Sequence, residues 1–189
     1  MGIQQMSDLS SQVLELMRRR QSVRKYSDRP VEREKLERCF EAARLAPSAC
    51  NAQPWSFVAV TDREILSRLR ENLFNKPYHM CAFAREAPVL VGLIAEPTTF
   101  WPTVGGLWRG VKFPLLDLGI AGEHFVLQAA AEGLGTCWLG WFNEREFKSI
   151  LRLPRKKKVA ALLSVGYAEA DDPLRDKIRK PIDDIRTCL

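Results

Sequence analysis

The segment Val111–Glu132 places the strongest constraint on the fold of this chain. Its apolar side chains fall on nearly all sides of a helix, a pattern that predicts a buried helix rather than an amphipathic surface helix. A chain of 189 residues suits a single domain in which to bury it. We therefore expect one central helix, and we expect a second subunit to cover part of its surface.

Strand patterns and helix patterns share the rest of the chain. Buried or half-buried strands are predicted by runs of apolar, aromatic and β-branched residues, at Trp55–Thr61, Ala87–Ala95, Thr136–Trp141 and Val159–Tyr167. Helices are predicted by apolar periodicity and cap residues, at Ser10–Arg20, Glu32–Leu45, Asp62–Leu73 and Asn143–Leu151. We expect an α+β fold with a mostly buried sheet flanked by helices, forming one domain over residues 1–189.

Several classes of protein are disfavoured. No apolar run reaches the length of a transmembrane helix, and the first residues do not resemble a signal peptide. The five cysteines form no CxxC pair, which disfavours a disulfide framework and a zinc site. We expect free thiols, a cytoplasmic location, and neither a membrane partner nor a bound metal.

The net charge of +6 admits several explanations. Basic residues concentrate in Arg18–Arg24, Arg152–Lys158 and Arg175–Lys180. Nucleic-acid binding is one reading of such clusters. A solvated turn explains the run Arg155–Lys158 more simply, so we expect no nucleic-acid partner.

The basic segment Arg18–Tyr26 mixes arginines with Ser22. Arginine makes forked, charge-assisted hydrogen bonds to phosphate oxygens, although exposed arginine clusters are common. Neither GxGxxG after a strand nor GxxxxGK[ST] occurs, so a Rossmann dinucleotide site and a P-loop are not supported. A phosphate bound here would be held by side chains.

A second polar segment, Leu45–Trp55, leaves a helix at Pro47 and enters a strand at Trp55. Ser48, Asn51 and Gln53 lie between these ends and can address the polar edge of a ring. A turn hydrogen-bonded to itself explains the same residues. The segment alone does not decide between the two.

The loop Glu96–Gly110 is long and contains Phe100, Trp101 and Trp108. Loops of this length are uncommon and often functional. A lid over a planar ligand and a structural loop packed on the core or on a partner explain it equally well.

Taken together, these segments resemble the FMN-dependent nitroreductase family. An Arg-x-Ser-x-Arg element at Arg20–Arg24 precedes PSxxNxQPW at Pro47–Trp55. Three further elements follow in the order that the family shows, namely Ala131–Phe142, Val165–Tyr167 and Lys177–Pro181. The ordered combination spans about residues 10–185. It implies a nitroreductase-like fold, with a mostly antiparallel or mixed sheet, and an intertwined homodimer.

The resemblance also implies which residues bind FMN. Positions that match the family's motifs are Arg20, Gln21, Ser22, Arg24, Pro47, Ser48, Asn51, Asn75, Leu139, Gly140, Trp141, Lys177 and Arg179. The basic residues would hold the phosphate and ribityl chain, with Arg24 near the pyrimidine edge and Lys177 and Arg179 closing from the C-terminal side. Ser48 and Asn51 would reach the flavin of the other subunit. Trp141 and Gln21 depart from the family's usual residues, which puts the acceptor preference in doubt.

The implied activity is hydride transfer from NAD(P)H through FMN to an electron-poor acceptor such as a nitroaromatic or a quinone. The flavin would carry the chemistry without a protein base, and Trp101, Trp108 and Trp141 are candidates for the substrate pocket. Other chemistry on the same cofactor, namely dehalogenation, azoline oxidation or flavin cleavage, is the main alternative. The third hypothesis is a non-enzymatic flavin-binding protein.

Overall fold

An antiparallel sheet forms the centre of the computed structural model, which describes residues 3–97, 106, 108 and 110–189. Its four strands are β1 (Trp55–Val60), β2 (Val89–Ala95), β3 (Gly135–Leu139) and β4 (Lys158–Gly166). Their order is β1-β2-β4-β3, and each neighbouring pair is antiparallel. Of the two arrangements expected, mostly antiparallel or mixed, the antiparallel one is found.

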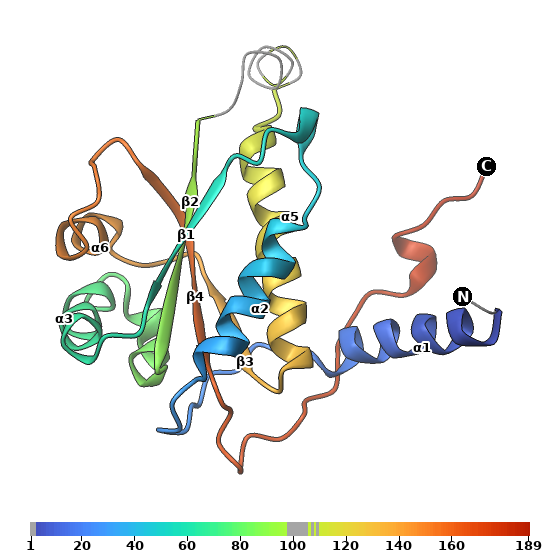
Figure 1. Cartoon of the computed structure of the whole chain (residues 1–189), viewed down its shortest axis with the longest axis horizontal. Helices are drawn as coiled ribbons and strands as arrows, with labels where there is room; N and C mark the ends of the chain where they lie inside the picture. The colour runs from blue at the N-terminus through green and yellow to red at the C-terminus, as the bar shows by residue number, and fades with distance from the viewer. Residues whose placement is uncertain (1–2, 98–105, 107, 109) are drawn as a thin grey trace.

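Helices cover both faces of the sheet (Figure 1). On one face lie α2 (Arg33–Arg44) and α5 (Phe113–Ala131), and on the other lie α3 (Arg63–Leu73) and α6 (Glu144–Ile150). Helix α1 (Ile3–Arg19) extends away from the body, on the same side as the C-terminal tail. Short 3₁₀ segments are η1 (Ala49–Asn51), η2 (His79–Glu86) and η3 (Ile182–Asp184). The α+β class predicted from the sequence is confirmed.

The sheet divides the core into two layers. Strand β2 contributes to both layers, because its side chains alternate between the faces of the sheet. Leu90 and Ile94 belong to the cluster beneath α3 and α6, which contains Phe147. Val91 and Leu93 belong to the cluster beneath α2 and α5. All of β2 except its last residue is buried, as its nearly continuous apolar sequence predicted.

Local signals set several helix ends as expected. Asp62 accepts a hydrogen bond from the Ile65 amide at 2.9 Å, and Asn143 accepts one from the Glu146 amide at 3.2 Å. Gly133 follows α5 with a φ of +75°, a conformation that favours glycine. The sequence predicts a C-cap at Gly133 and Gly135 after this helix. The prediction was wrong for Gly135, because this residue begins β3.

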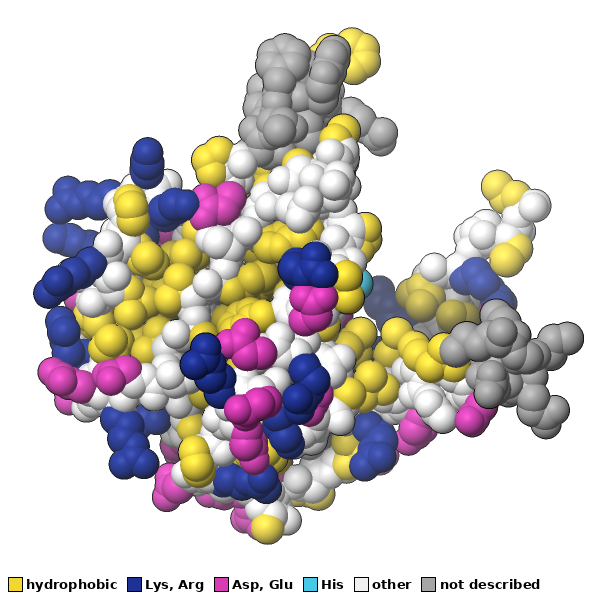
Figure 2. All heavy atoms as spheres, viewed as in Figure 1, with side chains coloured by type: hydrophobic (Ala, Val, Ile, Leu, Met, Phe, Trp, Pro, Cys, Tyr) yellow, Lys and Arg dark blue, Asp and Glu magenta, His cyan; other side chains and the backbone are white. Residues whose placement is uncertain are grey.

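Apolar faces of α1 and α5 remain uncovered in the single chain. Helix α1 begins at Ile3 instead of the predicted Ser10, and its Val13, Leu14 and Met17 are each nearly half exposed. Helix α5 was predicted to be buried all round, yet Leu116 is 55% exposed. Figure 2 shows apolar side chains over α1 and the tail at the right of the view. No helix in the described part of the chain could span a membrane.

Gly122 lies where α5 crosses the sheet, and it offers a test of this packing. A Cβ at this position would lie 2.3 Å from Cη2 of Trp138 and 2.8 Å from Cδ2 of Leu93. Gly→Ala inside a helix normally stabilises by about 1 kcal/mol, whereas overpacking costs about 1–3 kcal/mol. Gly122→Ala should therefore lower the free energy of unfolding, measured by urea denaturation. The loss should shrink in a Trp138→Phe background, and a stabilising Gly122→Ala would contradict the packing.

Candidate functional site

The basic segment is fixed to one end of the sheet by backbone hydrogen bonds. Ser22 forms a parallel bridge with Thr136, and the Val23 amide donates to the Thr136 carbonyl oxygen at 2.9 Å. The hydroxyl of Tyr26 donates to the Val23 carbonyl oxygen at 2.8 Å and lies 2.8 Å from the Ser164 hydroxyl. Burial raises the pKa of Tyr26 above its usual range, so the phenol stays protonated.

Two glycines allow the segment to lie this close. Gly135 of β3 and Gly166 of β4 are direct partners in the sheet. A Cβ on Gly135 would lie 2.5 Å from Cγ2 of Val23. A Cβ on Gly166 would lie 2.5 Å from Cδ of Pro88 and 2.9 Å from Cδ1 of Tyr26. A larger residue at Gly135 would push Val23 away from the sheet, and one at Gly166 would displace Pro88 as well as Tyr26.

Positive charge gathers where the C-terminal tail returns to this segment. The Lys177 ammonium donates a hydrogen bond to the Arg20 carbonyl oxygen. Desolvation, followed by the charges of Arg20, Arg179 and Arg175, lowers the pKa of Lys177. Three cations therefore lie close enough to Lys177 to act on its charge.

Acidic groups compensate this charge only in part. The Arg20 Nε atom lies 4.0 Å from a Glu123 carboxylate oxygen, and Arg175 pairs with Asp172 at 2.6 Å. Within the described ranges, no carboxylate lies within 4 Å of the Lys177 ammonium or the Arg179 guanidinium. This surplus of positive charge makes these residues candidates to hold an anion such as a phosphate.

Ser22 and Arg24 continue the site towards η2. Burial raises the pKa of the Cys137 thiol, while the Arg24 charge and the Ser22 hydroxyl act in the opposite direction, so both residues lie near Cys137. The Arg24 guanidinium also lies 5.7 Å from the centre of the Phe83 ring. Gln21 turns instead towards the tail, where its side-chain amide donates to the Pro173 carbonyl oxygen at 3.2 Å.

The exit of β3 forms a second, aromatic part of the site. Leu139 is buried in the core and Gly140 is exposed. A Cβ on Gly140 would meet no atom within 4 Å, so a flat ligand could approach this backbone. Trp141 is 52% exposed and its ring nitrogen donates to the Pro77 carbonyl oxygen at 3.1 Å. Its ring centre lies 5.4 Å from that of Tyr78, which fixes the indole beside the open backbone.

Strand β3 connects the basic and aromatic parts. Ser22 pairs with Thr136 near the start of β3, and Gly140 follows its last residue. Four residues of extended chain separate Thr136 from Gly140, or about 13 Å. The site therefore has a cationic end and an open, aromatic end on one edge strand.

Asn75 lies on the same loop as Pro77 and Tyr78, but its side chain is occupied locally. The amide nitrogen donates to the Glu71 carbonyl oxygen at 2.6 Å, and the amide oxygen accepts from Arg85 at 3.0 Å. In this arrangement Asn75 braces the loop that carries Tyr78. Its direct contact with a ring stays a prediction.

The polar turn after α2 has features of both explanations given for its sequence, a turn hydrogen-bonded to itself and a contact with a ligand. The Gln53 amide donates to the Ser48 hydroxyl at 2.9 Å, so the turn is partly bonded to itself. Cys50, Asn51 and Gln53 nevertheless adopt positive φ angles of 53°, 52° and 46°. Such backbone strain is typical of functional sites. Pro47 and Asn51 are exposed.

Within one subunit, this turn and the basic segment lie apart. The Ala49 amide donates to the Asp117 carboxylate at 3.2 Å, whereas Arg20 faces Glu123 on the same helix. Six helical residues correspond to about 9 Å along α5. The polar turn and the basic segment therefore contact α5 at two different points along its length.

Most of the loop Glu96–Gly110, for which a lid was one explanation, lies outside the described residues, and so does its Trp101. Trp108 is 93% exposed, so its side chain packs little against the described part of this subunit. Among the described residues, no cluster of His, Cys, Asp and Glu is placed to hold a metal ion.

Four residues of this region were not predicted from the sequence. Arg175 contacts Ser22, Phe83 lies beside Arg24, and Tyr78 lies beside Trp141. Asp172 pairs with Arg175. Arg175 was visible as part of a basic tail, but nothing in the sequence paired it with Ser22. The two rings carried no local signal.

Comparison with known proteins supports one family. The model of the nitroreductase family matches residues 17–79 and 75–167. An Archaeoglobus fulgidus protein, provisionally named an NADH dehydrogenase/NAD(P)H nitroreductase, is 31% identical over 174 residues, covering 84% of this chain and 91% of that protein.

Two solved structures share the fold. A nitroreductase family protein of Clostridium novyi NT has a TM-score of 0.73 at 30% identity, covering 87% of this chain and 88% of its own. An FMN-dependent nitroreductase of Clostridium difficile R20291 has a TM-score of 0.68 at 28% identity, and the match covers 86% of this chain and 91% of that one.

Proposed function

The chain belongs to the nitroreductase family, and from that premise we propose that it is an FMN-dependent oxidoreductase that uses NAD(P)H to reduce an electron-poor acceptor, with residues 1–189 acting as one domain. The observation that carries the proposal is the cationic cluster around Arg20 and Lys177, which carboxylates compensate only in part. It lies at one end of β3, and the open backbone at Gly140 lies at the other. When bound, FMN supplies the hydride chemistry between the two substrates.

Arg20, Lys177 and Arg179 bind the FMN phosphate in this proposal. Their charges repel one another in the free protein, and a phosphate dianion removes that repulsion. Arginine and lysine donate charge-assisted hydrogen bonds to phosphate oxygens. The Ser22 hydroxyl, near Cys137, is available to the ribityl chain.

The flavin ring lies at the other end of β3 in this proposal. Gly140 leaves its backbone open, so the ring can approach and the main chain can orient it. Arg24 brings positive charge towards this region, where it favours an electron-rich ring edge. Trp141 and Tyr78 form a rigid aromatic wall beside it, which suits a planar aromatic acceptor.

A homodimer completes the site. The uncovered apolar residues of α1, α5 and the tail gather on one side of the molecule, and exposed apolar patches of this kind mark interfaces. Pairing through this side buries the exposed face of α5 and allows Ser48 and Asn51 of one subunit to contact the flavin of the other. The strained, exposed turn at Asn51 supports this role.

The function is tested by spectroscopy followed by reduction. The purified protein, supplied with FMN, should show a bound-flavin absorption spectrum. Anaerobic stopped-flow mixing with NADH and with NADPH should then bleach it rapidly with at least one of them. No binding at micromolar FMN would refute the cofactor, and bound flavin that neither nucleotide reduces would favour other chemistry.

Arg20→Ala should weaken FMN binding about 10- to 100-fold, because a charged hydrogen bond is worth about 1.5–3 kcal/mol. Fluorescence titration measures the Kd, and size-exclusion chromatography should show that the dimer persists. Arg18→Ala is the matched control, since Arg18 pairs only with Glu15 at 3.8 Å in the described structure. An Arg20→Ala variant that purifies fully loaded with FMN would refute the phosphate assignment.

Lys177 should make FMN binding depend on pH. Its pKa is lowered in the free protein by desolvation and the nearby cations, and a bound phosphate raises that pKa again. Binding therefore takes up protons, and the Kd should rise as the pH increases through the lowered pKa of Lys177. Titrations above pH 7 isolate this effect, because the phosphate is already largely dianionic there. Lys177→Arg should remove the dependence, and an unchanged pH profile in that variant would contradict the role of Lys177.

Trp141→Ala should raise the KM for a nitroaromatic or quinone acceptor by about fivefold, since an aromatic contact is worth roughly 1 kcal/mol. Trp141→Phe keeps a ring and should lose less. Ferricyanide, which is not planar, serves as the control acceptor, and its KM should change little. An equal loss with ferricyanide would show that Trp141 acts on the flavin or the fold and not on acceptor binding.

A further inference from the structure

The C-terminal tail carries Lys177 and Arg179 but has little structure of its own. After Ala168 pairs with Tyr26, no helix or strand occurs until η3. Leu174 and Ile178 are 59% and 92% exposed. Apolar burial within the subunit therefore does not hold Lys177 beside Arg20.

Polar contacts connect the tail to the basic segment instead. The Arg175 amide donates to the Gln21 side-chain oxygen at 3.0 Å, and Gln21 donates back to the Pro173 carbonyl oxygen. The Arg175 guanidinium donates to the Ser22 carbonyl oxygen and to the Asp172 carboxylate, each at 2.6 Å. A single arginine thus ties the tail to two consecutive residues of the phosphate site.

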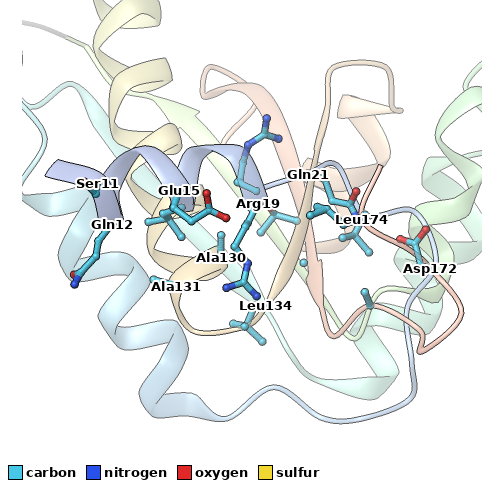
Figure 3. A pocket seen from close by; sticks show the side chains of 17 residues that line it. Ser11, Gln12, Glu15, Arg19, Gln21, Ala130, Ala131, Leu134, Asp172 and Leu174 are labelled. Carbon is cyan, nitrogen blue, oxygen red and sulfur yellow. The ribbon is translucent and has the colours of Figure 1, made fainter. Parts of the chain in front are cut away.

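Asp172 is the buried member of this group. Its side chain is 7% exposed, against 44% for Arg175, and its second oxygen has no hydrogen-bond partner among the described residues. Figure 3 shows Gln21, Asp172 and Leu174 together at one end of a cleft of about 800 Å³ that also runs along α1. Burying a carboxylate costs free energy unless it is paired, so the contact with Arg175 accounts for its place.

The negative charge of Asp172 can act in two ways, by repelling a nearby phosphate or by positioning a cation that binds it. Electrostatics alone makes a carboxylate unfavourable near a phosphate site, because like charges repel. Its presence there is useful only if it positions a cation. Asp172 holds Arg175 in the orientation that reaches Ser22, which in turn sets where the following residues run.

We propose that Gln21, Asp172 and Arg175 form a latch that orders the tail and thereby presents Lys177 and Arg179 to the phosphate. All three are positioning residues. The identity of the anion as the FMN phosphate rests on the proposed function. The ordering of the tail by the latch does not depend on the proposed function.

The variant Asp172→Asn tests the latch because the two explanations predict opposite signs. It keeps the shape of the side chain, removes a negative charge and replaces a charge-assisted hydrogen bond by a weaker neutral one. A latch predicts that the Kd for FMN rises about three- to tenfold. Electrostatics alone predicts that the Kd falls.

Two further variants sharpen the comparison. Arg175→Lys keeps the charge but loses the fork that spans Asp172 and Ser22, so the latch predicts weaker binding here as well. Asp171→Asn is the matched control, because Asp171 is 70% exposed and pairs with Lys25 at 3.5 Å, outside the latch. This control makes the same charge change, and its Kd for FMN should stay level or fall slightly.

The double variant Asp172→Asn/Arg175→Lys tests whether the two residues act together. The losses of FMN affinity should not add, because both changes break one unit.

Limited trypsin digestion of the flavin-free protein gives a readout that needs no cofactor. Cleavage after Lys177 and Arg179 should be faster in Asp172→Asn and Arg175→Lys than in the wild type, and unchanged in Asp171→Asn. Equal or tighter FMN binding by Asp172→Asn would overturn the latch, as would weaker binding with unchanged cleavage of the tail. A wild-type protein that binds no FMN would refute the proposed function, while the digestion would still decide whether the latch exists.

Discussion

The contact between the basic segment and the paired glycines Gly135 and Gly166 is the constraint on which the site depends. These residues face each other across β3 and β4, and their missing side chains leave room for Val23 and Tyr26. The segment is thereby held against the end of a sheet that is itself buried. Because Arg20, Ser22 and Arg24 belong to this short stretch, their positions follow from the packing of two uncharged neighbours.

The tail depends on the same contact. Lys177 binds the carbonyl oxygen of Arg20, and Arg175 binds that of Ser22. Backbone carbonyls serve as the anchor points, so the tail does not occupy the side chains of Arg20 and Ser22. In the proposed phosphate site, the sheet fixes one wall and the tail supplies the other, and β3 leads from there to the open backbone at Gly140.

The sequence predicted most elements because their signals are local. Asp62 and Asn143 cap helices through bonds three residues away, and the apolar run of β2 indicates burial on both faces wherever it lies. Predictions that depended on distant partners fared less well. Gly135 looked like a helix cap because the close approach of Val23 is not visible from neighbouring residues, and the exposed faces of α1 and α5 require a surface that the single chain does not contain.

The candidate site divides in the same way. Motif order identified the basic segment, the polar turn and the β3 exit, because family motifs are contiguous. The pairing of Trp141 with Tyr78 and of Arg175 with Asp172 joins residues that no motif links. The polar tail was especially uninformative, since charged, exposed residues have no periodicity from which a contact could be inferred.

The central claim is that each flavin site uses the basic segment of one subunit and the polar turn of the other, and mixing subunits tests it most directly. Arg20→Ala damages the first part and Asn51→Gly damages the second, with glycine chosen because Asn51 has a φ of 52°. Each variant alone should bind FMN weakly. In a mixed dimer of the two, shared sites predict that one site carries both defects and the other carries none, so half of the sites should regain wild-type affinity in a fluorescence titration. No recovery in the mixed dimer would contradict the account, because it would place each site within a single subunit.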